Sequence, residues 1–380
     1  MRVIFLTHNY PRFAGDIAGG FLHPLALALR ARGVDVRVIA PSDAGRGGSD
    51  VLDGVPIERV RYAAPERETL AYSGRMQDAL SSPGGIAAFY SLGQALRSGA
   101  QSAAEGHPDS VVHAHWWIPA GVAAPAELPL VLTSHGTDVR LLKRWAPARL
   151  LARPVYRRAR VVTAVSRYLA DLITSTTGRA VPPDCVQPMP VDTSHWNSST
   201  GGGGLIAVAR LTEQKRMHLV VGAVARLQAM GRPIRCAIVG DGPERVRLEQ
   251  LARAGQVQDL VEFTGQLEFP AVLSRLQRAD VAVIPARAEG FGLSAAEALM
   301  CGVPIVVCHD GGGLADLIEP GAGRAAPPDR VRIAEAVDQL LRDEGAREAA
   351  RGVGGLWRER LAPATVAARF EAWYHEALGA

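Results

Sequence analysis

Short apolar segments alternate with helix-forming segments along the chain, and this alternation restricts the fold more than any other feature. In the first half, a helix is expected at residues 25–32. The expected strands of that half cover residues 3–7, 36–40, 111–115, 130–134 and 161–165. Apolar strands separated by helices are typical of a parallel sheet covered on both faces. We therefore predict an α/β fold.

The second half repeats the scheme. Its expected strands cover residues 205–209, 236–239, 261–263, 281–285 and 305–307. Its expected helices lie near residues 216–230, 243–254, 269–278, 294–301 and 313–318. A chain of 380 residues exceeds the usual size of one core, so we predict two domains, each with its own sheet. The carboxyl ends of parallel strands are where such sheets bind ligands.

A stretch rich in proline and glycine, residues 181–204, predicts the domain boundary. It ends in the run Ser198-Ser-Thr-Gly-Gly-Gly-Gly204, whose composition indicates a flexible joint. We expect a first domain at residues 1–184 and a second at 185–361. The remaining segment, 362–380, is predicted to be an amphipathic helix with Phe370 and Trp373 on the face that needs a packing partner.

The composition favours a globular protein, with 48% apolar and 21% charged residues. The first apolar run is too short for a signal peptide, and no stretch approaches the length of a membrane helix, so we expect a soluble cytoplasmic protein. The cysteines lack the paired spacing of a zinc or redox site; they are Cys185, Cys236, Cys301 and Cys308.

Two glutamates flank a glycine turn in Glu289-Gly-Phe-Gly-Leu-Ser-Ala-Ala-Glu297. An apolar strand precedes the turn, and strong helix formers follow it. A helix that starts after such a turn presents backbone N–H groups and the positive end of its dipole to an anion. Because carboxylates accept hydrogen bonds from hydroxyls, the segment suits a ligand with phosphates and sugars. A solvated turn glutamate and a helix-dipole glutamate in any α/β protein are an equally good interpretation of this segment alone.

Lys143 and Lys215 are the only lysines among 42 basic residues. Lys215 lies shortly after Arg210, which follows the first strand of the second domain. An arginine can fork onto two phosphate oxygens, and a lysine adds a point charge. A lysine kept against an arginine bias favours a phosphate site over two ordinary surface charges.

Two turns of the first domain are candidate binding sites. Gly15-Asp-Ile-Ala-Gly19-Gly20 precedes the first helix, and adjacent glycines permit a backbone close to a ligand. His135-Gly-Thr-Asp138 follows a strand, where His135 can donate to a sugar hydroxyl and Asp138 could orient it. A turn closed by an Asx-type hydrogen bond from Asp138 is the alternative.

His113 and His115 lie on one face of a strand beside two tryptophans. They could bind a metal, but no acidic or cysteine partner at suitable spacing supports this, so a core or substrate-contact role is favoured. Val239-Gly240-Asp-Gly242-Pro could contact a base through its backbone. It lacks the full dinucleotide fingerprint, which argues against nicotinamide chemistry.

Together these motifs resemble the retaining GT-B glycosyltransferases of family 4. The matching segments are Gly19-Gly20, His135 to Asp138, Arg210 with Lys215, Val239 to Gly242, Glu289 to Glu297, and Gly302-Val-Pro-Ile-Val. In one departure, Gly312-Gly313-Leu-Ala-Asp316 stands where the family commonly has Gly-Gly-x-x-Glu. The shorter acid leaves the role of Asp316 open.

The resemblance implies a GT-B architecture, with two Rossmann-like, doubly wound domains facing across a cleft and the last helix packed on the first domain. It also implies a nucleotide-sugar donor on the second domain and an acceptor on the first. His135, Arg210, Lys215 and Glu289 would then be catalytic, with Arg210 and Lys215 on the diphosphate. The residues that would bind the donor are Gly19, Gly20, Asp138, Gly240, Gly242, Gly290, Phe291, Gly292, Leu293 and Glu297, the last on the ribose.

The family keeps the anomeric configuration, generally by same-face attack, so no protein nucleophile is assigned. With two cations and a helix terminus to stabilise the leaving group, we expect that no metal or other cofactor is required. The donor base, the sugar and the acceptor stay open. Acceptor choice is assigned to the loops expected between residues 42 and 110.

Other functions compete with sugar transfer. One is a nucleotide-sugar epimerase on the same scaffold, and another is a non-catalytic nucleotide-sugar-binding protein. Nucleic-acid binding is disfavoured because the net charge is only +4 and the basic residues are spread along the chain. The basic and apolar segment 140–160 could lie on an anionic membrane, which would suit a lipid-linked acceptor, or be a solvated face.

Overall fold

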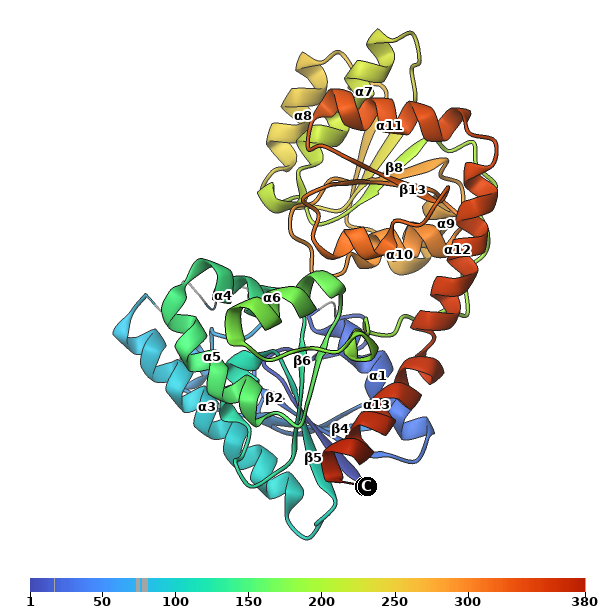
Figure 1. Ribbon diagram of the computed structural model, residues 1–380. Coiled ribbons are helices and arrows are strands. Elements are labelled where there is room, and N and C mark those ends of the chain that lie inside the picture. Colours follow the sequence, from blue (N-terminus) through green and yellow to red (C-terminus); the bar gives the residue numbers. More distant parts are fainter. Residues whose placement is uncertain (17, 73–75, 77–80, 380) are drawn as a thin grey trace. The chain divides into compact units, whose positions relative to one another are not determined.

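The chain divides into two structural units, which we call unit 1 and unit 2. The computed structural model describes residues 1–16, 18–72, 76 and 81–379 (Figure 1). Unit 1 contains residues 1–192 and the segment from Leu361 onward, and unit 2 contains Thr193–Arg360. Each unit is an α/β layer structure built on its own sheet.

The sheet of unit 1 has the strand order β3-β4-β2-β1-β5-β6-β7, in which the pairing of β3 with β4 is antiparallel and the others are parallel. The central strands are buried along most of their length, which explains their continuous apolar sequences. The strands are β1 (Arg2–Leu6), β2 (Asp35–Pro41), β3 (Gly48–Leu52), β4 (Val55–Val60), β5 (Ser110–His115), β6 (Leu130–Ser134) and β7 (Val161–Ala164). The helices are α1 (His23–Ala31), α3 (Pro83–Ala104), α4 (Thr137–Arg144), α5 (Ala146–Arg158), α6 (Arg167–Thr177) and α13 (Pro363–Leu378).

The sheet of unit 2 is parallel throughout, with the order β10-β9-β8-β11-β12-β13. Its strands are β8 (Leu205–Val208), β9 (Cys236–Val239), β10 (Val261–Gly265), β11 (Val281–Ile284), β12 (Ile305–Cys308) and β13 (Gly323–Ala326). Its helices are α7 (Met217–Ala229), α8 (Arg245–Ala254), α9 (Phe269–Leu276), α10 (Leu293–Met300), α11 (Arg330–Arg342) and α12 (Ala346–Leu361), the last of which ends at the first residue of the returning segment.

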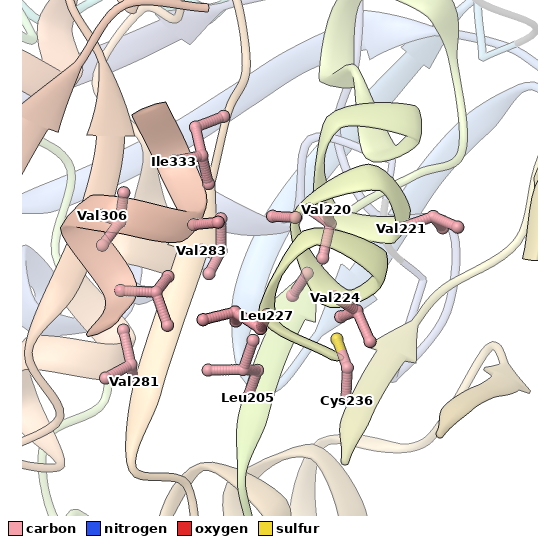
Figure 2. Close-up of a cluster of buried hydrophobic side chains, with 14 of the residues drawn as sticks. Leu205, Val220, Val221, Val224, Leu227, Cys236, Val281, Val283, Val306 and Ile333 are labelled. Atoms are coloured by element: carbon pink, nitrogen blue, oxygen red, sulfur yellow. The ribbon is translucent and has the colours of Figure 1, made fainter. Parts of the chain in front are cut away.

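One apolar layer of unit 2 lies between the sheet and α7 (Figure 2). Val220, Val224 and Leu227 recur at helical spacing on α7 and pack with strand residues such as Leu205 and Val283. Burying a side chain of this size contributes roughly 1.5–3 kcal/mol. The periodicity of the α7 sequence therefore fixes which face of the helix meets the sheet.

The strands predicted from the sequence are present, with ends that shift by one or two residues. The helix predicted near residues 313–318 is a 3₁₀ helix over Gly313–Leu317. The prediction of loops between residues 42 and 110 was wrong, since this region contains β3, β4 and α3. The edge strand β3 is largely exposed, and α3 is rich in small residues, so neither has the apolar run on which the strand and helix predictions depended.

The division between the units lies after Asp192, which is within the predicted boundary stretch 181–204 and later than the expected domain end at residue 184. The intervening segment is hydrogen-bonded to unit 1: the Gln187 backbone N–H donates to the carbonyl of Ala164 (2.9 Å), and that of Val191 to the carbonyl of Leu361 (3.0 Å). These backbone bonds, which leave no trace in composition, hold the proline-rich stretch on the first sheet.

The glycine run at 198–204 is not the flexible joint that its composition predicted. Thr200 N–H donates to the Gln277 carbonyl and Gly203 N–H to the Arg278 carbonyl, while Asp280 accepts from Gly202 and Gly204. The run is therefore an ordered lead-in to β8. Its glycines permit the approach, because a Cβ on Gly204 would lie 2.3 Å from the Arg235 carbonyl oxygen.

The last helix, α13, packs in unit 1. Phe370 and Tyr374 are fully buried, and the Tyr374 hydroxyl pairs with Nδ1 of His113 at 2.8 Å. On the outer face, Arg32, which directly follows α1, donates to Glu371. The apolar face of this helix is thus covered by α1 and the first sheet. None of the described helices combines the length and the apolar character needed to cross a membrane.

Candidate functional site

In unit 2, the neighbouring strands β8 and β11 bring charged residues to the carboxyl end of the sheet. Lys215 ends a 3₁₀ turn before α7, and Glu289 lies in the segment after β11. Nζ of Lys215 donates to Oε1 of Glu289 over 2.6 Å. Both side chains are largely buried, with exposed fractions of 26% and 14%. The fold therefore unites in one ion pair two residues that the sequence analysis selected separately.

The backbone around Glu289 is fixed on both sides. Its N–H donates to the Gly311 carbonyl, and its own carbonyl accepts from Gly313 N–H, both at 2.9 Å. Ala288, just before it, has φ of 52°, a left-handed conformation that side chains other than glycine adopt only under constraint. The Glu289 carboxylate is held in a defined position before any ligand arrives.

Three residues of this site were missed by the sequence analysis. Gln214 donates to Glu289 (3.3 Å) and to the Arg287 carbonyl (3.0 Å). Arg216 forks onto both carboxylate oxygens of Asp310, at 2.8 and 2.7 Å. That bidentate pair raises the pKa of Arg216 and lowers the pKa of Asp310. The only signal in the sequence was the position of Asp310 just after an apolar strand.

Arg210 is exposed after β8 and pairs with no carboxylate in the part of the chain that the structure describes. Unlike Lys215 and Arg216, it has no ion pair to give up before it can meet an anion. The structure thus places a solvated guanidinium on the same strand-to-helix connection as the Lys215 pair.

Gly240 and Gly242 are required by close backbone approach. A Cβ on Gly240 would lie 2.0 Å from the Ala209 carbonyl oxygen, and one on Gly242 would lie 2.4 Å from that of Leu211. The Leu211 N–H also donates to the Asp241 carbonyl at 2.9 Å. These glycines therefore pack the β9 loop against the segment that carries Arg210.

The helix α10 begins at Leu293, directly after the turn that contains Gly290 and Gly292. Gly292 has φ of 99°, and a Cβ there would lie 2.2 Å from Leu314. Phe291 is buried against Trp357. These contacts fix the helix N-terminus at the carboxyl end of the sheet.

Glu297 lies on the second turn of α10, and burial raises the pKa of its carboxyl to about 7. It accepts no hydrogen bond from the described residues, in contrast to Glu289. Asp316 is located in the 3₁₀ helix after β12.

In unit 1, the turn after β6 presents His135, which is partly exposed. Burial of its ring lowers the pKa of His135 to about 3. Nε2 of His135 lies 3.1 Å from Nδ1 of His115, and its ring packs against Trp116 and Phe21 at centroid distances of 4.6 and 5.0 Å. The imidazole is therefore neutral and held in one orientation.

Asp138 does not contact the His135 ring. Its carboxylate is buried and accepts from the backbone N–H groups of His135 (3.3 Å), Gly136 (3.0 Å) and Trp117 (3.3 Å). Burial raises the pKa of Asp138, and these donors oppose the rise. These donors precede Asp138 in the sequence, so the bonds are not those of an Asx turn, which would run to an N–H further along the chain. Asp138 instead closes the turn before it rather than facing a ligand.

Gly19 and Gly20 differ in what surrounds them. Gly19 has φ of 68°, and a Cβ there would lie 2.2 Å from the Asn9 carbonyl oxygen. A Cβ on Gly20 would meet nothing within 4 Å. Close backbone packing explains why residue 19 is a glycine. At residue 20, the absence of a side chain leaves open space beside the backbone.

Within the described residues, no three or more His, Cys, Asp or Glu side chains are grouped so that they could hold a metal ion. His113 is a core residue, since its ring nitrogens pair with Tyr374 and with Thr133 (2.7 Å).

Comparisons with known proteins agree with this arrangement. The family model "Glycosyl transferase 4-like domain" matches residues 19–192, and "Glycosyl transferases group 1" matches residues 195–352. Glycogen synthase of Mycobacterium tuberculosis is 30% identical, over 92% of this chain and 88% of that protein.

Solved structures show the same fold. Sucrose-phosphate synthase from Thermosynechococcus elongatus superposes with a TM-score of 0.77 at 20% identity, over 99% of this chain and 98% of that one. Anabaena HepE in complex with UDP gives 0.72 at 17% identity, over 98% and 99%. The chain has the GT-B fold and belongs to the group 1 glycosyltransferases of family 4, which makes it a glycosyltransferase.

Proposed function

We propose that this enzyme transfers a hexosyl or N-acetylhexosaminyl group from a UDP- or GDP-sugar to an acceptor, with retention of anomeric configuration and without a metal ion. The observation that carries the proposal is the Lys215–Glu289 pair at the carboxyl end of the unit 2 sheet, on the same strand-to-helix connection as Arg210, which forms no ion pair with a described residue. The names of the similar proteins add support, since one is a glycogen synthase and another was solved with UDP.

In this proposal, two positively charged side chains bind the diphosphate of the donor. Arg210 contacts two phosphate oxygens, and Lys215 supplies a second positive charge while Glu289 keeps it in place. The N-terminus of α10 adds backbone N–H groups at Gly292 and Leu293. As the sugar leaves, negative charge grows on the diphosphate, and fixed positive groups lower the energy of that state. Since these groups supply the charge that a metal would, none is needed.

In this proposal, carboxylates accept hydrogen bonds from the hydroxyls of the donor. Glu297, which has no hydrogen-bond donor among the described residues, accepts from the ribose, and Glu289 contacts the transferred sugar together with Gly290 and Phe291. From unit 1, His135 donates to the sugar. No side chain is assigned as nucleophile; the leaving phosphate accepts the proton of the acceptor hydroxyl on the same face.

The acceptor is a glycan, a lipid-linked sugar or a small molecule, as in the building of cell-envelope polysaccharides. A lipid-linked acceptor would suit the segment of α4 and α5, where Trp145 between the helices and Leu150 and Leu151 on α5 are exposed by 52%, 68% and 55% among arginines. We propose a cytoplasmic enzyme that associates peripherally with the inner face of the membrane.

A thermal-shift screen of UDP-, GDP- and ADP-sugars tests the donor. One of them at a hundredfold excess over its dissociation constant should stabilise the folded protein by about 2.7 kcal/mol. The stabilising sugar is then incubated with and without acceptors. Conversion of the sugar without an acceptor would favour an epimerase, and binding with no turnover under any condition would favour a non-catalytic sensor.

A further inference from the structure

Two fully buried histidines of unit 1, His113 and His115, lie next to the partly exposed His135. His113 and His115 alternate on one face of β5, and their rings lie 4.0 Å apart. His135 follows the neighbouring strand β6, and its Nε2 lies 3.1 Å from Nδ1 of His115. A contact between two ring nitrogens at this distance contains one proton, which one imidazole donates and the other accepts.

The surroundings of His115, the buried member of the His115–His135 pair, decide which ring donates the shared proton. His115 is fully buried, and its Nε2 has no hydrogen-bond partner in the described part of the chain. The rings that pack against His115 include Phe5, whose ring centroid is 4.9 Å away in an edge contact, and His113. Burial keeps both imidazoles neutral, so each ring has one N–H and one bare nitrogen.

Two assignments are available. If His135 donates through Nε2–H, His115 must carry its own proton on Nε2, where a buried N–H would have no acceptor. If His115 donates through Nδ1–H, its bare Nε2 is left without a partner among the described residues, and His135 carries its proton on Nδ1. Orphaned buried N–H groups are the rarer case in folded proteins, which favours the second assignment. The Nδ1 of His135 pairs with no described residue, so its proton stays available to a ligand.

We propose that His115 is a positioning residue that holds His135 in the Nδ1–H form, so that His135 meets the substrate as a hydrogen-bond donor and not as a base. The substrate group that it takes is an oxygen acceptor, a sugar hydroxyl or a phosphate oxygen. This inference rests on the proposed function for the role of His135, but the tautomer itself does not depend on that function. Which ring nitrogen carries the proton is set by the bond that the other nitrogen makes.

The test is nuclear magnetic resonance of the full chain with ¹⁵N-labelled histidine, since ring nitrogen shifts distinguish the tautomers. Loss of a signal in His135→Asn assigns His135. In the wild type, we expect the Nδ1–H form of His135 at neutral pH. An Nε2–H form in the wild type would overturn the proposal directly, without any variant.

Two substitutions of His115 separate tautomer control from packing. His115→Leu fills a similar volume without a donor, and His115→Asn keeps an amide donor near the position of Nδ1. We expect His135 to lose its uniform Nδ1–H form in the first and to keep it in the second. Tyr374→Phe is the matched control, because it removes a buried hydrogen bond to His113 and leaves the His115–His135 contact intact.

Turnover adds a second readout. His115→Leu should lower kcat by about 10- to 100-fold, the effect typical of losing a group that orients a functional histidine, and His115→Asn should restore most of it. Tyr374→Phe should lower thermal stability and leave the His135 tautomer unchanged. An unchanged His135 tautomer in His115→Leu would overturn the proposal. If no variant or wild type transfers sugar, the proposed function fails while the spectra still decide the tautomer.

Discussion

Lys215 and Glu289 depend on each other for position and charge. Each is largely buried, so removing one leaves the other as an uncompensated charge in a partly desolvated place. Lys215→Ala should reduce turnover by roughly a hundred- to a thousandfold, as expected for the loss of one preorganised donor to a developing anion. Steady-state kinetics with the donor found by the thermal-shift screen measures this loss.

An ion pair elsewhere in unit 2 provides the control for Lys215. Arg275 forks onto Glu262 at 2.6 and 2.7 Å, but Glu262 is exposed. Arg275→Ala should change stability by at most about 1 kcal/mol and leave turnover as it is. Near-normal turnover in Lys215→Ala would contradict the assignment of this lysine to the diphosphate.

Glu297 predicts a pH dependence of stability. Burial raises the pKa of its carboxyl from 4.5 to about 7 in the folded chain. Between these values the unfolded chain releases the proton and the folded chain keeps it, so this contribution to the free energy of unfolding is complete below pH 4.5 and is lost as pH rises through 7. Glu297→Gln should abolish this pH-dependent decrease in the free energy of unfolding, which is on the order of 1–3 kcal/mol at pH 8.

Denaturant unfolding at several pH values measures this effect. Glu319→Gln replaces an exposed carboxylate of the same unit and should keep the wild-type pH dependence. If Glu297→Gln also kept it, the buried carboxyl would not be the group that titrates.

For single residues, the sequence predicted which side chains belong to the candidate site better than it predicted which side chains contact one another. Glu289 and Lys215 stood out because a turn motif and a rare lysine are visible locally. Arg216 and Asp310 are 94 positions apart, and their bond follows from the order of β8, β11 and β12, which no spacing reveals. The role of Asp138 was ambiguous for a related reason, since only the fold shows that its oxygens are occupied by backbone N–H groups.

Elements with continuous apolar runs were predictable from the sequence, and elements without such runs were not. The strands β8 and β11 consist of four buried or nearly buried residues each, flanked by turn residues. The hairpin β3–β4 and the helix α3 rely on partners in the tertiary structure, and the glycine run before β8 is ordered by hydrogen bonds to Gln277, Arg278 and Asp280. Composition alone could not distinguish this last segment from a linker.

The glycine turn before α1 allows packing and function to be separated within one element. Gly19→Ala introduces a Cβ 2.2 Å from a backbone oxygen at a left-handed φ, so it should destabilise unit 1. Gly20→Ala introduces a Cβ into open space and should leave thermal stability unchanged. If the Gly20 backbone meets the ligand, the same substitution should raise the KM for donor or acceptor. Unchanged kinetics in Gly20→Ala would remove this glycine from the site.

The chain passes from unit 1 to unit 2 and returns, so the last helix, α13, packs against the sheet of unit 1, whose first strand begins at Arg2. Composition and length predicted two domains, and the apolar face of the tail predicted that it needs a partner. The residues at which the chain crosses depend on the hydrogen bonds of Gln187 and Val191, which became visible only in the fold. Each unit has its own apolar core, which raises the question of whether the two are stable independently.

Phe370 tests whether the units unfold separately. Its ring is fully buried in unit 1 beside Trp373 and His113. Phe370→Ala should therefore lower the stability of unit 1 by about 3–5 kcal/mol. Amide hydrogen exchange should show faster exchange in β1 and β5 and unchanged protection in β8 and β11, because the core of unit 2 keeps all its contacts. Glu371→Ala, which loses only the outer bond to Arg32, should change neither. Equal loss of protection in both sheets would mean that the two units unfold as one cooperative structure.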